Sequence, residues 1–265
     1  MTVPLVSIAM GVHNGENTLA ACIDSIQQQK FSKWEFIIFN DGSTDHTAEI
    51  LKKYQEKDSR IIILSGEGKS GLAAGLNKCI SVSKGKYIAR MDDDDISFPD
   101  RLAKQVYYLE ENEHIDAVGT SMIVFDESGD RGIRRNDSLV TKESFLKGTP
   151  FFHPTVMIKK DVLEKLHGYR TDVGRTEDLD LWFRFFANGY KGANLIEPLL
   201  RYHEATSDYD KRTFRNGIFA SKVLFKGYRS IKVPLLNRWR ALRPIVSATM
   251  PNILIKKYHE LKLDR

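Results

Sequence analysis

The chain has 265 residues, 42% of them hydrophobic, which is enough for one large α/β domain with its own core. Its formal net charge of +5 is uneven, because residues 211–265 hold 14 Lys and Arg against 2 Asp and Glu, whereas residues 1–210 hold 26 against 33. With only two cysteines, Cys22 and Cys79, the chain cannot form a disulfide framework, and it lacks a signal-peptide or membrane-spanning pattern, so we expect a cytoplasmic protein.

The first 115 residues alternate between short β-rich runs and helical patterns. We predict strands at residues 5–10, 34–39, 60–64 and 86–91, and helices at 16–29, 47–57, 70–83 and 98–112. In the first helix, Leu19, Cys22, Ile23 and Ile26 recur at helical spacing. Such an alternation predicts an α/β fold with a mainly parallel, doubly wound sheet. Ligands of such sheets bind beyond the carboxyl ends of the strands.

Three polar clusters follow predicted strands. They are VHNGE at 12–16, NDGSTD at 40–45 and MDDDD at 91–95. The first two are also typical of turns and helix caps, so both interpretations stay open. Four adjacent aspartates exceed the one or two acceptors that a cap needs, and their carboxylates raise one another's pKa values unless a positive charge lies among them. Because Mg²⁺ binds one or two carboxylates together with substrate phosphates, this run predicts a metal-bridged nucleotide site.

Beyond residue 115 the alternation loosens. Residues 116–131 predict a strand and a hairpin, and residues 153–169 predict a strand, a cap at Asp161 and a helix ended by Gly168.

Residues 174–190 predict a further helix, with Leu181, Phe185 and Phe186 on its core face. Its first turn carries Glu177, Asp178 and Asp180. Acidic residues there suit the helix dipole, which is a purely structural alternative for Glu177 and Asp178.

Five motifs together resemble the family 2 glycosyltransferases, which are inverting enzymes of the GT-A fold that use nucleotide-sugar donors. The motifs are VSIAMGVHNGE, NDGSTDHTAEIL, the segment 71–105, FFHPTVMIKKDVL and TEDLDLWFRF, in the family's order across about residues 4–205. The resemblance implies a Rossmann-like, mainly parallel sheet flanked by helices. We expect a catalytic domain at 1–210, with a nucleotide-sugar half to about residue 115 and an acceptor half beyond it, followed by a basic helical tail at 211–265.

The resemblance also implies residue roles. The positions it assigns to the nucleotide are Val12, Asn14, Glu16, Asn40 and Asp41. The Asp-x-Asp motif maps to Asp92 and Asp94, with Asp94 preferred as a ligand of Mn²⁺ or Mg²⁺. Asp93 joins the donor site and Asp95 supports it. The catalytic pair is Glu177 and Asp178, with Asp178 as the base.

The sequence departs from the family at several positions. Gly11-Val12-His13 replaces the commoner Pro-x-Tyr, and Asn40 stands where aspartate is frequent, so whether Asn40 or Asp41 contacts the base stays open. Arg201 or His203 would approach the diphosphate or have a surface role. His153 either supports a hairpin or shapes the acceptor site.

The resemblance predicts a metal-dependent inverting transferase that moves a sugar, by default from a UDP-sugar, to a glycan or polyprenyl-diphosphate-linked acceptor in bacterial surface polysaccharide synthesis. The alternative is a non-catalytic module of the same fold that docks on a membrane through its tail. A nucleotidyltransferase would need a glycine-rich, arginine-containing loop, which MGVHNGEN is not. No nucleic-acid-binding module is evident.

The tail interleaves basic residues with apolar ones. Pro234, Pro244 and Pro251 divide it into helices too short to span a bilayer but suited to an interface. Its apolar and aromatic side chains include Phe219, Leu224, Phe225, Leu235, Leu236, Trp239, Ile253 and Leu254. We predict contact with the anionic inner face of the cytoplasmic membrane. The alternatives are packing on the catalytic body and a homodimer contact.

Overall fold

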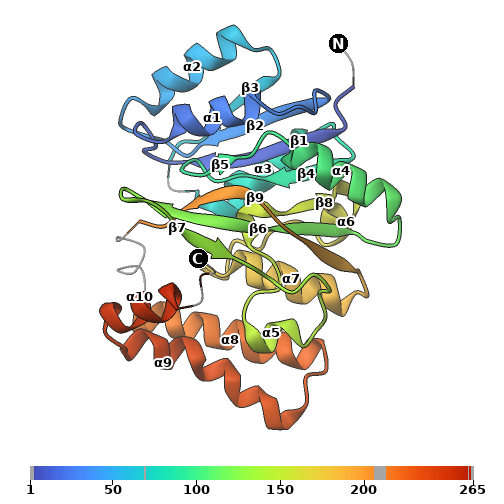
Figure 1. Ribbon diagram of the computed structural model, residues 1–265, viewed down its shortest axis with the longest axis vertical. Helices are drawn as coiled ribbons and strands as arrows, with labels where there is room; N and C mark the ends of the chain where they lie inside the picture. Colours follow the sequence, from blue (N-terminus) through green and yellow to red (C-terminus); the bar gives the residue numbers. More distant parts are fainter. Residues whose placement is uncertain (1–2, 69, 206–212, 262, 264–265) are drawn as a thin grey trace.

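The computed structural model describes residues 3–68, 70–205, 213–261 and 263 (Figure 1). The predicted boundary between catalytic domain and tail, at residues 210 and 211, lies outside the described residues. So do four basic residues of the tail, which are Lys211, Arg212, Lys262 and Arg265.

The first half of the chain forms a parallel sheet in the order β3-β2-β1-β4. Its strands are β1 (Val6–Val12), β2 (Trp34–Asn40), β3 (Ile61–Ser65) and β4 (Tyr87–Arg90). Its helices are α1 (Leu19–Gln27), α2 (Thr47–Lys57), α3 (Leu72–Val82) and α4 (Arg101–Glu111). The eight predicted elements are confirmed. Strands β1, β2 and β4 are nearly continuous in apolar residues because helices cover both faces of a parallel sheet.

Both cysteines are buried and unpaired, on opposite faces of this sheet. Cys22 lies on α1 with Leu19, Ile23 and Ile26, all fully buried, which confirms the predicted core face of that helix. Cys79 lies on α3, within the other core cluster.

Five further strands extend the same sheet with mixed pairings. They are β5 (Ile96–Ser97), which precedes α4, and β6 (Ala117–Asp126), β7 (Gly129–Arg134), β8 (Met157–Lys159) and β9 (Gly192–His203) in the second half of the chain. Strand β8 lies antiparallel between β4 and β6, β7 completes the predicted hairpin with β6, and β9 runs parallel to β6. Sequence analysis missed β9, because exposed residues and Pro198 interrupt its alternation. The fold class is as predicted, with the parallel character concentrated in the first half.

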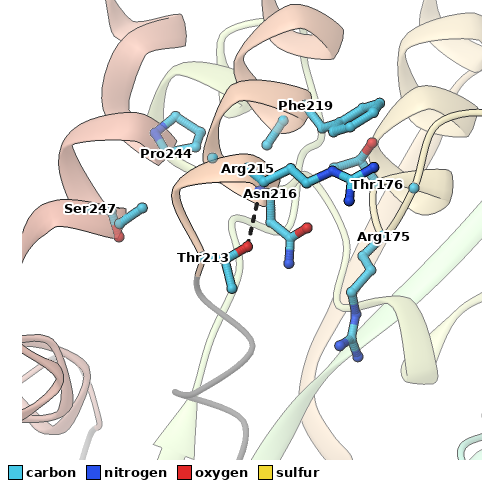
Figure 2. Close-up of a pocket in the computed structure, with 12 residues that line it drawn as sticks. Arg175, Thr176, Thr213, Arg215, Asn216, Phe219, Pro244 and Ser247 are labelled. Atoms are coloured by element: carbon cyan, nitrogen blue, oxygen red, sulfur yellow. Dashed lines mark hydrogen bonds between the residues drawn. The ribbon is translucent and has the colours of Figure 1, made fainter.

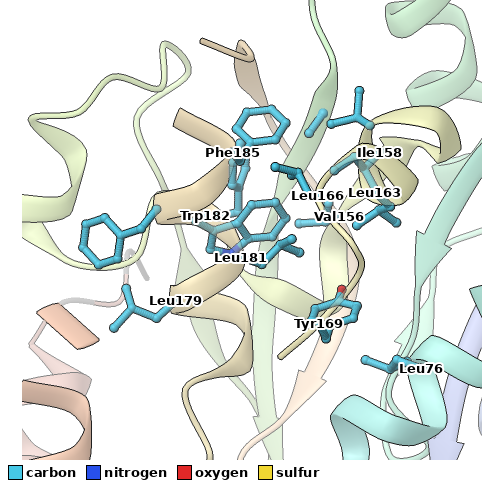
Figure 3. Packing of buried hydrophobic residues seen from close by; sticks show 14 of the residues in the cluster. Leu76, Val156, Ile158, Leu163, Leu166, Tyr169, Leu179, Leu181, Trp182 and Phe185 are labelled. Atoms are coloured by element: carbon cyan, nitrogen blue, oxygen red, sulfur yellow. The ribbon is translucent and has the colours of Figure 1, made fainter. Parts of the chain in front are cut away.

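Helices α6 (Lys160–Lys165) and α7 (Glu177–Ala187) of the second half pack together with residues of the sheet. Helix α7 buries Leu181, Trp182 and Phe185 against residues of β8 and of α6, as Figure 3 shows. Phe186 is only partly buried. Nearby are the short helix α5 (Ser144–Lys147) and the 3-10 turn η1 (His153–Thr155).

One predicted cap is wrong. Helix α6 begins at Lys160 without a side-chain cap, and Asp161 instead lies in its first turn, where it pairs with Lys165 at 2.8 Å. Gly168 follows the helix with a φ of +64°, in the left-handed region that favours glycine.

The tail forms helices that lie along the lower side of the molecule (Figure 1). They are α8 (Phe214–Ser230), the 3-10 segment η3 (Leu235–Leu242), α9 (Arg243–Thr249) and α10 (Asn252–Glu260). The three prolines lie at the starts of the last three, as predicted. Helix α8 packs on α7, where Gly227 lies against the Phe183 ring and the Tyr228 hydroxyl donates to the Phe145 carbonyl. In the part of the chain that the structure describes, no helix combines the length and apolarity needed to cross a bilayer.

Candidate active site

The three polar clusters predicted from the sequence lie at one edge of the sheet. Because β1, β2 and β4 are parallel neighbours, their carboxyl ends and the loops that follow come together. Gly15, in the loop after β1, lies so close to the aspartate run that a Cβ atom there would be 2.5 Å from the Asp93 carboxylate. The loop after β1 therefore borders the aspartates that follow β4.

Side chains of the first loop hold the second loop in place. Asn14, which has a left-handed φ of +57°, accepts a hydrogen bond from the Thr44 amide at 2.8 Å. Glu16 accepts one from the His46 amide at 3.0 Å. The buried Val12 accepts one from the Asp41 amide through its carbonyl. These three predicted nucleotide residues therefore shape the loop pair that borders the site.

Asn40 and Asp41 follow β2 and differ in their surroundings. Asn40 is buried, and its side-chain oxygen accepts a hydrogen bond from the Ser43 amide. Asp41 accepts hydrogen bonds from the amides of Gly71 and Ser70, at 2.8 and 2.9 Å. Although partial burial acts to raise it, these hydrogen bonds lower the pKa of Asp41. The Asp41 carboxyl group is therefore ionised at neutral pH, whereas the Asn40 amide is uncharged.

The aspartate run after β4 is crowded and largely buried. Burial and the neighbouring charges of Asp94 and Asp92 raise the pKa of Asp93 to about 7. Burial also raises the pKa of Asp94, and that of Asp95 well above its usual value. Asp95 is fully buried, with one carboxylate oxygen accepting from the His203 amide and the other without a described partner. Negative charge thus accumulates here beyond what hydrogen bonds satisfy.

Two basic side chains face this run. The Arg90 guanidinium, the last side chain of β4, forms an ion pair with Asp92. The His203 ring lies 3.5 Å from Asp94. Sequence analysis missed Arg90, although a signal was present: a charged residue in an otherwise apolar strand is buried and therefore needs an ionic partner. Arg90 therefore supplies a positive charge among the four aspartates, as their mutual repulsion predicts.

The run can supply part of a metal site. Among the described residues, no group of three or more His, Cys, Asp or Glu side chains is arranged to hold a metal. Mg²⁺ and Mn²⁺ prefer hard oxygen ligands, and Mg²⁺ commonly takes one or two carboxylates together with substrate phosphates and water. The unsatisfied Asp95 oxygen and the raised pKa values of Asp93 and Asp94 agree with a place suited to a cation. Asp92 and Asp94 are the two carboxylates of the predicted Asp-x-Asp motif within this run.

Glu177 and Asp178 open α7. Glu177 is buried and Asp178 partly buried, and the Leu179 amide donates to Asp178 at 2.7 Å. Burial raises the pKa of both carboxyl groups, while the Arg90 charge lowers both. The same arginine thus acts on the aspartate run and on the predicted base. The structure brings these two acidic motifs together across 85 residues of sequence.

Hydrogen bonds from polar side chains hold the backbone next to Arg90 in place. Arg101, almost fully buried on α4, donates to the carbonyls of Arg90 and Pro154. His153, which precedes Pro154, lies in η1, and its ring forms a hydrogen bond with the Tyr169 hydroxyl at 2.8 Å. Burial and the Arg90 charge lower the pKa of His153 well below its usual value, so its ring is neutral. His153 therefore lies in a 3-10 turn among the groups beneath Arg90.

Arg201 and His203, both on β9, lie in different places. Arg201 donates to Asp130 of β7 and lies over the Phe125 ring at 4.5 Å. His203 faces Asp94. Of the two, His203 belongs to the acidic site.

Sequence comparisons match this chain to one family over most of its length. The sequence model of Glycosyl transferase family 2 matches residues 7–167. A putative glycosyltransferase EpsE of Bacillus subtilis is 41% identical over 263 residues, covering 98% of this chain and 95% of the relative. The O-antigen biosynthesis glycosyltransferase WbnJ of Escherichia coli is 37% identical over 204 residues, covering 75% of this chain and 79% of the relative.

Solved structures share the fold at low sequence identity. S. aureus TarS 1-349 in complex with UDP-GlcNAc superposes with a TM-score of 0.65 at 16% identity, covering 92% of this chain and 81% of that one. The mannosyltransferase PcManGT from Pyrobaculum calidifontis, in complex with GDP-Man and Mn²⁺, has a TM-score of 0.66 at 18% identity and covers 98% and 81%.

Proposed function

Since this chain belongs to glycosyl transferase family 2 and is therefore a glycosyltransferase of the GT-A fold, we propose that it is a metal-dependent, inverting enzyme of surface polysaccharide synthesis. It moves a sugar from a nucleotide diphosphate donor to a glycan or a polyprenyl-diphosphate-linked acceptor. The relatives named for O-antigen and amylovoran biosynthesis support this setting. The observation that carries the proposal is the meeting of the aspartate run and the Glu177-Asp178 pair around Arg90.

The donor lies at the carboxyl ends of β1, β2 and β4. Its nucleotide contacts the loops that carry Val12, Asn14, Glu16, Asn40 and Asp41, with Asp93 at their border. UDP is the proposed nucleotide, which agrees with the UDP and UDP-GlcNAc complexes of TarS. A GDP-sugar is the first alternative to test, because PcManGT binds GDP-Man.

Asp92 and Asp94 would hold Mn²⁺ or Mg²⁺ against the donor diphosphate. When bound, such an ion supplies Lewis-acid stabilisation of the charge that develops on the leaving group. Arg90 balances Asp92 when no cation is bound, and the His203 ring lies 3.5 Å from Asp94.

Asp178 acts as the general base. It takes the proton from an acceptor hydroxyl, whose oxygen attacks the anomeric carbon on the face opposite the diphosphate and inverts its configuration. Burial raises the pKa of Asp178 and strengthens it as a base, while the Arg90 charge favours its ionised form. Glu177 lies beside it on the same turn, where burial raises its pKa and the Arg90 charge opposes that rise.

The test is a screen of UDP-, GDP- and dTDP-sugars for transfer and donor hydrolysis with Mn²⁺ or Mg²⁺, with EDTA as the metal-free arm. Asp178→Asn should lower kcat by about 10² to 10⁴-fold with little change in donor affinity. The matched control is Asp180→Asn, on the same turn but paired with Arg184. Turnover that persists in EDTA would remove the metal from the proposal, and an α-linked product from a UDP-α-sugar would remove the inversion.

The competing proposal, a non-catalytic module that docks on membranes, predicts a different result. It expects donor binding without turnover for every sugar in the panel. The Arg90 charge, which acts on both Asp92 and Asp178, favours the enzyme.

We also propose that the tail contacts an anionic membrane surface. Seven of its eight named apolar residues are exposed, with Leu235 and Leu236 at 78% and 85%. Within the described tail, no lysine or arginine lies at ion-pair distance from a carboxylate. Exposed apolar side chains and uncompensated positive charge together suit the interface of anionic lipids.

A further inference from the structure

A pocket of about 480 Å³ lies between the start of α7 and the helices of the tail. Arg175 and Thr176 line it from the residues just before α7, and Thr213, Arg215 and Phe219 line it from α8 (Figure 2). Two helix starts therefore meet at this pocket, one of which carries the proposed base.

The polar side of the pocket is positively charged. Arg175 and Arg215 are both exposed, and neither has an acidic partner among the described residues. In Figure 2 the Arg215 side chain extends from α8 toward the segment that carries Arg175 and Thr176. The start of the 17-residue helix α8, capped by Thr213 on the Asn216 amide, adds its dipole. Two unpaired guanidinium groups on one pocket are suited to phosphate oxygens.

The pocket also has apolar lining. Phe219, which is 38% exposed, lines it together with Ala220, Pro244 and Ala248. A pocket lined by both guanidinium groups and apolar side chains matches a phosphate group joined to a hydrocarbon chain.

The position of the pocket connects it to the reaction. Thr176, in its wall, is the N-cap residue of α7, and Asp178 follows two residues later. The donor loops lie instead at the ends of β1, β2 and β4. The pocket therefore adjoins the start of α7 and shares no lining residue with the proposed nucleotide site.

We propose that this pocket binds the phosphate or diphosphate group of an acceptor carried on an apolar chain. The inference rests on the proposed function and adds a residue set to it: Arg175 and Arg215 bind the anion, and Phe219 contacts the chain. It also gives the tail a second task, because α8 supplies half of the pocket.

The test measures binding of geranyl diphosphate to the full chain by calorimetry in EDTA, without donor. Arg175→Gln and Arg215→Gln should each weaken binding by about tenfold or more, and Arg215→Lys should recover part of it, because these are charge-assisted hydrogen bonds. The matched control is Arg229→Gln, which removes the same charge from the far end of α8, outside the pocket. Geraniol should bind far more weakly than geranyl diphosphate, and inorganic pyrophosphate should bind with an intermediate affinity.

Three results would overturn this assignment: equal binding of geraniol and geranyl diphosphate, equal losses in Arg229→Gln and Arg215→Gln, or displacement of geranyl diphosphate by UDP. Donor hydrolysis separates this inference from the proposed function. A wild-type chain that hydrolyses the donor but does not bind geranyl diphosphate would refute the pocket alone.

Discussion

Arg90 is the residue on which the acidic site depends. A buried guanidinium is costly without partners, and four adjacent aspartates are costly without a cation. The two costs offset one another in the Arg90–Asp92 ion pair, and the Arg90 charge reaches Glu177 and Asp178 as well. One side chain at the end of β4 thus links the proposed metal ligand with the proposed base.

The pH dependence of activity should report this link. Asp178 has a raised pKa and must be ionised to act as a base, so kcat/KM should fall as the pH drops through that raised pKa. Arg90→Gln removes a charge that lowers the pKa, so the acidic limb should move to higher pH. Arg90→Lys should keep the limb near its wild-type position. A limb that does not move in Arg90→Gln would contradict the link.

The aspartate run should cost the metal-free protein stability at neutral pH. The pKa of Asp93 is raised from 3.8 to about 7, so its contribution is favourable at low pH and is lost as the pH rises toward 7. In EDTA, Asp93→Asn should therefore raise Tm at pH 8 more than at pH 4. Asp24→Asn, on the exposed side of α1, is the control for loss of one charge. Equal Tm shifts for Asp93→Asn at both pH values would contradict the prediction.

At the scale of elements, the packing of α8 on α7 joins the tail to the catalytic body. It depends on Gly227, because a Cβ atom there would lie 2.1 Å from the Phe183 ring. Phe183 stacks in turn on Phe145, with ring centroids 4.2 Å apart. The absence of a side chain at one position therefore lets two helices approach closely.

Gly227→Val should loosen this contact. Overpacking of a core costs about 1–3 kcal/mol, which exceeds the gain in helix propensity of about 0.4 kcal/mol from replacing glycine with valine. The free energy of unfolding, measured in urea, should fall by about that difference or more. Lys226→Ala, at the exposed neighbouring position, serves as the control and should change it by less than about 0.5 kcal/mol. An unchanged free energy in Gly227→Val would mean that α7 and α8 are not closely packed.

At the scale of the whole molecule, the tail has two faces. Tyr228, Ile231 and Val233 join the same core cluster as α7, whereas Leu235, Leu236 and Trp239 are exposed. Packing on the body and contact with a membrane are therefore compatible, because different residues serve each. Removal of the whole tail would expose the core residues, so point substitutions are the cleaner test.

The triple variant Leu235→Ser, Leu236→Ser and Trp239→Ser should fold normally and lose binding to anionic liposomes in co-sedimentation. Wild-type binding should weaken with added salt, since each basic residue near an anionic surface contributes about 1 kcal/mol. Neutral liposomes are the control surface. Light scattering tests the alternative, a homodimer contact. If the wild type is a dimer, the variant is a monomer and neither binds lipid, these residues serve self-association.

The sequence alone determined the strand and helix alternation, the fold class and the grouping of three polar clusters. These follow from local information, since burial imposes a period on neighbouring residues and parallel strands bring their carboxyl ends to one edge. Tertiary structure alone decided that the Arg90 charge acts on both Asp92 and Asp178, that β9 pairs with β6, and that Arg175 and Arg215 share a pocket. Each of these depends on segments far apart in the chain meeting through the mixed half of the sheet and the packing of α8 on α7, which no local pattern encodes.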